Sequence, residues 1–202
     1  MNNELTAFLC DYLAFNLGKD EAMRAAEALS VKYGSLAVIA SSGAHEIAGI
    51  EGMTKSAALS LKLLTYVHSR SITDKFQRPE RYSEEELKEY ITALFHGLSV
   101  ETVYCLLFDK NMRLIGTEHL GEGTVNSSEI YPRRILECAC RRGAAGVIIA
   151  HNHPKGTAEA SEADLIGTSF IRNVLQGAGI DLMGHYLVAD NECVKMDAEI
   201  FK

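Results

Sequence analysis

The sequence predicts an α/β protein in two parts, a small helical domain followed by an α/β domain. Three observations support this division. Residues 1–74 carry helical periodicity without a strand signal, residues 75–82 are charged and aperiodic, and strand and helix patterns alternate over residues 83–202. With 47% hydrophobic and 23% charged residues, the chain is typical of a globular protein that buries a core.

Apolar residues recur at helical spacing in the first two predicted helices, and Gly18 and Gly34 mark where these helices stop. The periodic positions are Leu5, Phe8, Leu9, Tyr12 and Leu13, then Ala22, Ala25, Ala26 and Leu29. Residues 70–82 lose this period and gain charges and a proline, which indicates a linker. We therefore expect a domain boundary near residue 75.

The second part opens with a helix and a hairpin. Ser83 and Glu86 have the spacing of a capping box, and Gly97 follows the helix that they begin. Apolar segments at 103–108 and 112–115 flank an Asp-Lys-Asn turn. This pattern predicts two antiparallel strands joined by a short loop.

Helices and strands then alternate to the end of the chain. Pro132 sits at the start of a predicted helix over 132–142, where a proline is well tolerated. Residues 144–150 are almost wholly apolar, which indicates a strand covered on both faces. A further helix is predicted over 161–177 and a last strand over 180–189.

Two histidines follow the buried strand at positions 151 and 153. Side chains at i and i+2 of an extended segment point to the same side, so both rings can reach one ion. Asp164 lies one turn into the next helix and could complete a three-ligand set. Two imidazoles, a carboxylate and a water are typical of a catalytic zinc site, in which the ion lowers the pKa of the water to about 7.

A second interpretation of the same residues needs no metal. An HxH pair also occurs in surface loops, and Ser161 with Asp164 has the spacing of a capping box. The position favours the metal site, because α/β proteins bind ligands at the carboxyl ends of their strands.

The pattern H-x-H-x7-S-x2-D formed by His151, His153, Ser161 and Asp164 resembles the JAMM motif of MPN-domain metalloproteases. The strings GVIIAHNHPKG and GEGTVNSSEIYPRRIL resemble the RadC family, UPF0758-type bacterial proteins named for DNA repair, and the similarity spans essentially the whole chain. The resemblance implies a helix-hairpin-helix-like region, then an MPN domain of cytidine-deaminase-like fold with a mixed sheet. It also implies one Zn2+ per chain.

The resemblance also assigns two catalytic residues. Glu101 in VETVYCLLFDKN matches the glutamate that takes a proton from the water and delivers it to the leaving group. Ser161 would donate a hydrogen bond to the developing oxyanion. From the residues alone, an exposed glutamate at a strand edge is the preferred interpretation of Glu101. The implied function is hydrolysis of a peptide or isopeptide bond in a peptide or protein substrate.

The chain departs from the family pattern at three places. Lys155 replaces the usual serine in the HPSG string, and Arg134 replaces an acidic residue. Gly184 replaces the aspartate before His185, which is a reserve ligand or else a structural histidine of the last strand. Substrate preference could therefore differ from that of other members, with Lys155 favouring an acidic substrate or product.

The helical region contains the stretch HEIAGIEGMTKSAALSLKL, which resembles a phosphate-binding helix-hairpin-helix. Gly52 occupies the hairpin, Thr54 stands where the second glycine is usual, and Lys55 and Lys62 could contact phosphates. The net charge of −7 provides no general attraction for DNA, so we expect weak binding at best. Open alternatives are a protein-docking domain, a DNA-associated factor that uses the metal as a nuclease, and a non-catalytic MPN scaffold. The retained ligand set argues against a scaffold.

The five cysteines include no CxxC pair, which favours reduced thiols and a cytoplasmic protein. Cys138 and Cys140 lie two apart on a predicted helix, so their side chains face different ways. The chain has no uncharged run approaching the roughly 20 residues that cross a bilayer, and the first residues lack a basic signal segment. The oligomeric state is not predicted.

Overall fold

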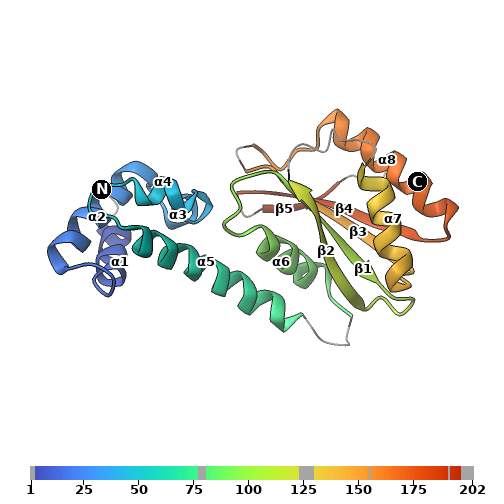
Figure 1. Ribbon diagram of the computed structural model, residues 1–202. Coiled ribbons are helices and arrows are strands. Elements are labelled where there is room, and N and C mark those ends of the chain that lie inside the picture. Colours follow the sequence, from blue (N-terminus) through green and yellow to red (C-terminus); the bar gives the residue numbers. More distant parts are fainter. Residues whose placement is uncertain (1–2, 77–80, 123–129, 155, 191, 197–202) are drawn as a thin grey trace. The chain divides into compact units, whose positions relative to one another are not determined.

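The computed structural model describes residues 3–76, 81–122, 130–154, 156–190 and 192–196. The chain divides into two compact units (Figure 1). The first, here called the helical unit, comprises Met1–Ser71 and His96–Ser99, and the second, the α/β unit, comprises Ile72–Phe95 and Val100–Lys202.

The helical unit confirms the predicted helical periods. Its helices are α1 Asn3–Leu13, α2 Lys19–Tyr33, α3 Leu36–Ser41, α4 Ala44–Ala48 and α5, which runs over Lys55–Lys75. The periodic leucines and alanines of α1 and α2 form a buried core with residues of α3, α4 and α5. Gly34 ends α2 in the left-handed conformation, with φ of 71°, which a glycine adopts without strain.

The predicted linker is wrong for residues 70–75, because α5 continues through Lys75. Arg70, Asp74 and Lys75 are exposed, so the charges that interrupt the apolar period belong to the solvated face of a helix. The next residue, Phe76, is buried and its ring contacts those of Tyr82 and Tyr90. Residues 77–80, which contain the proline of this segment, lie outside the described residues.

The α/β unit confirms the predicted fold class, with a five-stranded mixed sheet in the order β2-β1-β3-β4-β5. The strands are β1 Thr102–Phe108, β2 Leu114–Glu122, β3 Gly146–Asn152, β4 Asp181–Ala189 and β5 Glu192–Lys195. Only β3 and β4 are a parallel pair among these strands, and the other neighbours are antiparallel. The short edge strand β5 was not predicted, because four residues are too few to show a period.

Helices cover both faces of this sheet (Figure 1). The helices are α6 Glu84–Phe95, α7 Ile130–Arg142 and α8 Glu162–Gly177. The predicted capping box of α6 is confirmed, since the Glu86 backbone N–H donates to Ser83 Oγ at 3.2 Å and the Ser83 N–H donates to the Glu86 carboxylate at 2.9 Å. The helix predicted over 132–142 begins two residues earlier and keeps Pro132 in its first turn.

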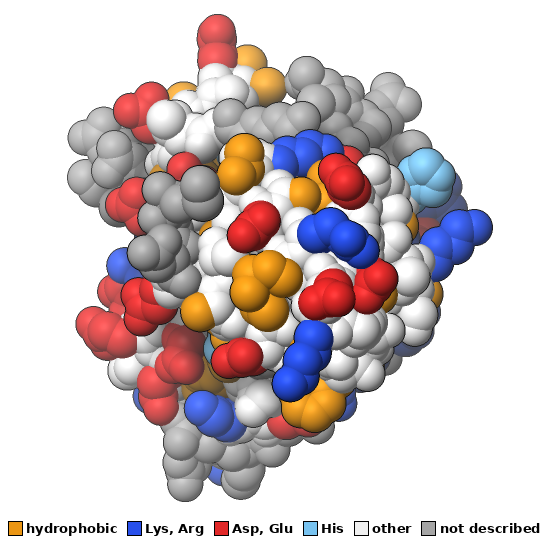
Figure 2. All heavy atoms as spheres, turned by 90° about the vertical axis from the view of Figure 1, so that its left-hand side faces the viewer, with side chains coloured by type: hydrophobic (Ala, Val, Ile, Leu, Met, Phe, Trp, Pro, Cys, Tyr) orange, Lys and Arg blue, Asp and Glu red, His pale blue; other side chains and the backbone are white. Residues whose placement is uncertain are grey.

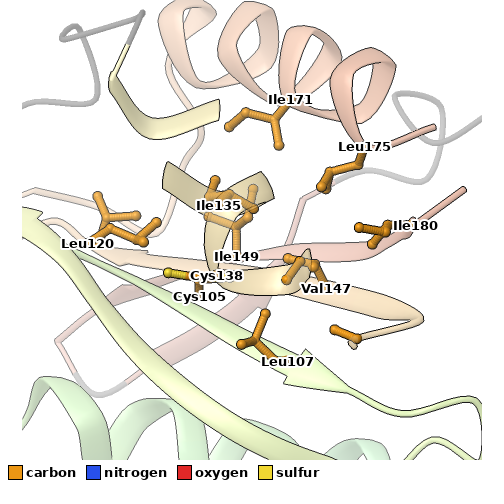
Figure 3. Close-up of a cluster of buried hydrophobic side chains, with 13 residues drawn as sticks. Cys105, Leu107, Leu120, Ile135, Cys138, Val147, Ile149, Ile171, Leu175 and Ile180 are labelled. Atoms are coloured by element: carbon orange, nitrogen blue, oxygen red, sulfur yellow. The ribbon is translucent and has the colours of Figure 1, made fainter. Parts of the chain in front are cut away.

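The central strand β3 is buried along its whole length, as its apolar run predicts. Val147 and Ile149 point toward α7 and α8 and pack in one cluster with Ile135, Ile171 and Leu175 (Figure 3). Because side chains alternate along a strand, His151 points to the same side as Val147 and Ile149. The fold therefore directs this histidine toward α8.

Among the described residues, no helix combines the length and apolar character needed to cross a membrane. All five cysteines are free thiols. Cys138 is buried in the core against Cys105, whereas Cys140 on the same helix is exposed, as their spacing predicts.

The buried strand gives a test of the packing. We expect Ile149→Ala to lower the free energy of unfolding by about 2–5 kcal/mol, because it opens a cavity in the core. Ile166→Ala removes the same atoms from an exposed position on α8 and should change it by no more than about 0.5 kcal/mol. Urea unfolding followed by circular dichroism measures both, and equal losses would contradict this packing.

Candidate metal centre

The predicted metal ligands come together where β3 ends and α8 begins. His151 lies near the end of β3, His153 follows it, and Asp164 stands in the first turn of α8. His151, His153 and Asp164 each offer one ligand atom, and these atoms lie within 4.8 Å of one another. They are the only such group of histidine, cysteine and acidic side chains found among the described residues.

The capping box of α8 is present as well, so the two interpretations of these residues are compatible. The Asp164 N–H donates to Ser161 Oγ at 3.2 Å, and Asp164 Oδ2 accepts from the Ser161 N–H at 2.8 Å. Oδ2 also accepts from the Ser161 hydroxyl at 2.6 Å. The cap thus occupies one carboxylate oxygen and fixes Asp164, while Oδ1 faces His151.

The separations between ligand atoms fit a small tetrahedral ion along two edges. His151 Nε2 lies 3.2 Å from His153 Nε2 and 3.3 Å from Asp164 Oδ1. Ligand atoms about 2.0–2.1 Å from a tetrahedral zinc are about 3.3–3.4 Å apart. The contact from His153 Nε2 to Asp164 Oδ2 is longer, at 3.9 Å. One ligand atom from each of the three residues lies within 4.8 Å of the others, which a shared ion would draw closer.

The hydrogen bonds of the two rings favour a cation between them. His153 Nδ1 lies 3.2 Å from the carbonyl oxygen of Thr157, which can only accept, so Nδ1 carries the hydrogen. His151 Nδ1 lies 2.8 Å from His185 Nε2, which leaves His151 Nε2 as the atom that faces Asp164. A single proton between these groups could be shared by one acceptor pair only, whereas a metal ion can be bound by both imidazole nitrogens and the carboxylate oxygen.

Burial keeps His151 neutral. Its side chain is fully buried, and burial lowers the pKa of His151 to about 4 even though the Asp164 carboxylate raises it in part. Metal ions bind the neutral imidazole, so this ring needs no deprotonation at neutral pH. Asp164 is also buried, and an anion that faces a neutral ring in the interior favours a bound cation.

Ser161 is engaged with Asp164 in this structure. Its one hydroxyl hydrogen goes to Asp164 Oδ2. The predicted donation to an oxyanion therefore requires the hydroxyl to turn away from the carboxylate. This role of Ser161 stays a prediction.

Glu101 directly precedes β1, beside the end of β3. Val103 pairs with His151, the last pair of β1 with β3, so Glu101 lies two residues beyond the paired segment, on the side toward which β3 continues to His153. Asn152 holds the backbone on both sides of Glu101, because its Oδ1 accepts from the Thr102 N–H at 2.7 Å and its Nδ2 donates to Val100 O at 3.2 Å. The role of Glu101 as a proton carrier stays a prediction.

Asn152 is a site residue that the sequence analysis missed. The alternation of side chains correctly turns it away from the two histidines, and it was therefore given no role. The sequence did contain a signal for a role of Asn152. It is an amide at the end of a buried strand, between two candidate ligands, and a buried polar group needs hydrogen-bond partners.

Two of the three departures from the family pattern lie among the described residues. Arg134 donates to the carbonyl oxygens of Leu120 and His119 and so supports β2. A Cβ at Gly184 would lie 3.0 Å from Lys195 Cε and 3.1 Å from a Tyr186 ring carbon, so this position has little room for a side chain. Lys155 lies outside the described residues.

His185 is buried behind His151. Its Nε2 contacts His151 Nδ1, and its Nδ1 lies 2.6 Å from Thr168 Oγ1. Both ring nitrogens are thus occupied by neighbouring side chains, and His185 is not part of the group whose atoms converge.

The candidate phosphate-binding hairpin is formed only in part. Gly52 has a φ of 79°, and Thr54 Oγ1 accepts from the Ala57 N–H at 3.1 Å, so this threonine caps α5. Lys62, predicted as a phosphate contact, instead donates to the carbonyl oxygens of Ala40 and Gly97, and burial lowers its pKa. Lys55 is exposed.

The charges on the surface are mixed. Figure 2 faces the side on which Figure 1 shows α1 and α2, and acidic, basic and hydrophobic side chains are interspersed on it. No continuous basic strip crosses the described part of that face. This view gives no support to an electrostatic track for DNA.

Comparisons with known proteins find a family model and relatives that match most of this chain. A family model described as the RadC-like JAB domain matches residues 81–200. A UPF0758 protein of Pseudoalteromonas translucida is 33% identical over 151 residues, which cover 74% of this chain and 67% of that protein. A UPF0758 protein of Aliivibrio fischeri is 30% identical over 174 residues, which cover 86% of this chain and 78% of that protein.

The converging atoms predict metal binding. Zinc titration with a competing chelator should give one ion per chain, and His151→Ala and Asp164→Asn should each weaken binding by at least about 100-fold, because each removes a direct ligand. His45→Ala removes an exposed histidine of the helical unit and serves as the control. Unchanged metal content in both ligand variants would refute the site.

The partly formed hairpin of the helical unit leads us to expect weak DNA binding. With Lys62 turned inward and a net charge of −7, we expect binding of duplex DNA to be weak and lost as salt rises toward physiological concentration. Fluorescence anisotropy over a salt series measures this. Sub-micromolar affinity that persists at physiological salt would show that the helical unit is a DNA-binding module.

Proposed function

The chain belongs to the RadC family, with a RadC-like JAB domain over residues 81–200, and we propose that it is a zinc-dependent hydrolase of peptide or isopeptide bonds. One observation carries this proposal. His151, His153 and Asp164 bring two imidazole nitrogens and a carboxylate oxygen to one point at the end of a buried strand.

These three residues would hold the ion. Two nitrogen ligands and one oxygen ligand suit zinc, and three protein ligands leave a coordination position for water, as in catalytic sites. When bound, such an ion lowers the pKa of a water and polarises a carbonyl group. The remaining roles, proton transfer and stabilisation of the oxyanion, are assigned to side chains of the protein.

Glu101 is proposed to carry the proton. As the water oxygen attacks the carbonyl carbon, the Glu101 carboxylate takes a proton from that water. It then delivers the proton to the amide nitrogen as the carbon–nitrogen bond breaks, which releases an amine and a carboxylic acid, and the acid passes its proton to the amine or to solvent. The two hydrogen bonds from Asn152 to the backbone beside Glu101 would keep this carboxylate in register with His153.

Ser161 is proposed to assist the attack. A turn of its hydroxyl away from Asp164 Oδ2 would let it donate to the oxyanion that forms on the carbonyl oxygen. The Ser161 backbone N–H would still hold Asp164 during this turn.

The proposed substrate is a peptide or protein that approaches from the side of His153. This side chain is 22% exposed, whereas those of His151 and Asp164 are 0% and 3% exposed. Access to the centre is therefore expected along His153.

We propose the cytoplasm as the place where the protein acts. The support is chemical, because five free thiols suit a reducing compartment better than an oxidising one. Cys105 is deeply buried, and burial raises the pKa of its thiol, so this cysteine is unreactive.

The proton carrier gives the test of this function. Zinc-loaded protein is screened against libraries of peptides and of lysine-linked isopeptides, with release of new amines as the measurement. We expect Glu101→Gln to keep the zinc and to lower the rate by about 100- to 10,000-fold, because it removes the proton carrier.

Glu192→Gln is the control, since this glutamate is exposed on β5. Full activity in Glu101→Gln would refute the proton carrier. No amine release by the wild-type protein from either library would refute the proposed substrate class.

A further inference from the structure

A row of three buried polar side chains runs inward from the metal centre. It begins at His151, passes through His185 on β4 and ends at Thr168 on α8. We propose that Thr168 and His185 are positioning residues that hold His151 in the tautomer whose Nε2 is free to bind the metal. This inference rests on the proposed metal site and adds two residues that contact neither the ion nor the substrate.

The row is well formed and closed to solvent. His151 Nδ1 lies 2.8 Å from His185 Nε2, and His185 Nδ1 lies 2.6 Å from Thr168 Oγ1. Thr168 Oγ1 lies 2.6 Å from the carbonyl oxygen of Asp164. The three side chains belong to residues that are at most 1% exposed, so these groups depend on one another for hydrogen bonds.

The direction of each bond follows from the Asp164 carbonyl oxygen. A carbonyl oxygen can only accept, and a threonine hydroxyl has one hydrogen, so Thr168 donates to Asp164. Thr168 Oγ1 must then accept from His185, which places a hydrogen on His185 Nδ1.

The same reasoning continues to the metal ligand. A neutral ring has one hydrogen, so His185 Nε2 has none and accepts from His151 Nδ1. His151 therefore carries its hydrogen on Nδ1, and its Nε2 presents a lone pair toward Asp164 Oδ1 and His153.

Neutrality of both rings is what this environment favours. The partners of His185 in the row are His151 and Thr168, neither of them an anion, and a charged ring buried without an anionic partner is costly. A charged His185 would donate from Nε2 and force the hydrogen of His151 onto Nε2, where it would block the ligand position.

Helix α8 thus carries both a direct ligand, Asp164, and the threonine at the inner end of the row. Asp164 directs a carboxylate oxygen at the metal position, and its backbone carbonyl accepts the hydrogen bond from Thr168, where the row ends. Partners behind ligating histidines typically contribute 10- to 100-fold to metal affinity.

The test replaces the Thr168 hydroxyl by a methyl group in the full chain. Thr168→Val leaves the hydrogen on His185 Nδ1 without its acceptor, which favours the opposite tautomer in both rings. We expect zinc affinity, measured against a chelator, to fall about 10- to 100-fold. Nitrogen-15 NMR of metal-free Thr168→Val should show the hydrogen of His151 on Nε2 instead of Nδ1. Thr168→Ser should restore both the zinc affinity and the original tautomer.

Ser169→Ala is the matched control. The Ser169 hydroxyl donates to the Leu165 carbonyl oxygen at 3.0 Å, which is the same type of bond on the exposed side of α8. It should change neither the tautomer nor the affinity. An unchanged tautomer in Thr168→Val, or an equal loss of affinity in Ser169→Ala, would overturn the proposal.

A second pair of variants decides the matter if Thr168→Val does not fold. His185→Gln keeps an oxygen that can accept from His151 Nδ1 and should retain zinc affinity within a few fold, whereas His185→Leu should lose about 10- to 100-fold. Equal affinities in this pair would overturn the proposal. Absence of zinc binding in the wild-type protein would instead refute the proposed function, while the tautomer in metal-free protein would still decide the present inference.

Discussion

A buried neutral imidazole has two nitrogens and one hydrogen, and the candidate metal centre depends on how the hydrogen of His151 is placed. Its Nδ1 is directed at His185 and its Nε2 at Asp164 and His153. The fold provides these neighbours because β3 and β4 are parallel and adjacent, and because α8 packs over the face to which His151 points. The centre is buried because β3 is covered on both faces. This burial lowers the pKa of His151 and so favours the neutral ring to which a metal ion binds.

Elements that build the fold also form the candidate site. The capping box that begins α8 fixes the carboxylate of Asp164, so a device of helix stability also sets a ligand. The amide of Asn152 closes the hydrogen bonding where β1 meets β3, and it thereby holds the backbone around Glu101. A substitution at either place would disturb structure and site together, which is why matched control variants matter in this protein.

Much of the α/β unit and its ligand set could be predicted from the sequence, because local patterns determine them. The apolar run of β3, the Ser161 cap and the spacing of His151 and His153 are each readable over a few residues. The roles of Asn152 and Thr168 could not be predicted, since their partners lie far away in the sequence. The charged end of α5 was misread because a solvated helix face and a linker have the same composition.

X-ray absorption spectroscopy of the zinc-loaded full chain tests the ligand set most directly. The account predicts a four-coordinate ion with two imidazole nitrogens at about 2.0–2.1 Å and oxygen atoms in the remaining positions. A sulfur atom at about 2.3 Å would mean that a cysteine binds the ion. That result, or a shell of oxygen atoms without imidazole scattering, would contradict a centre built from His151, His153 and Asp164.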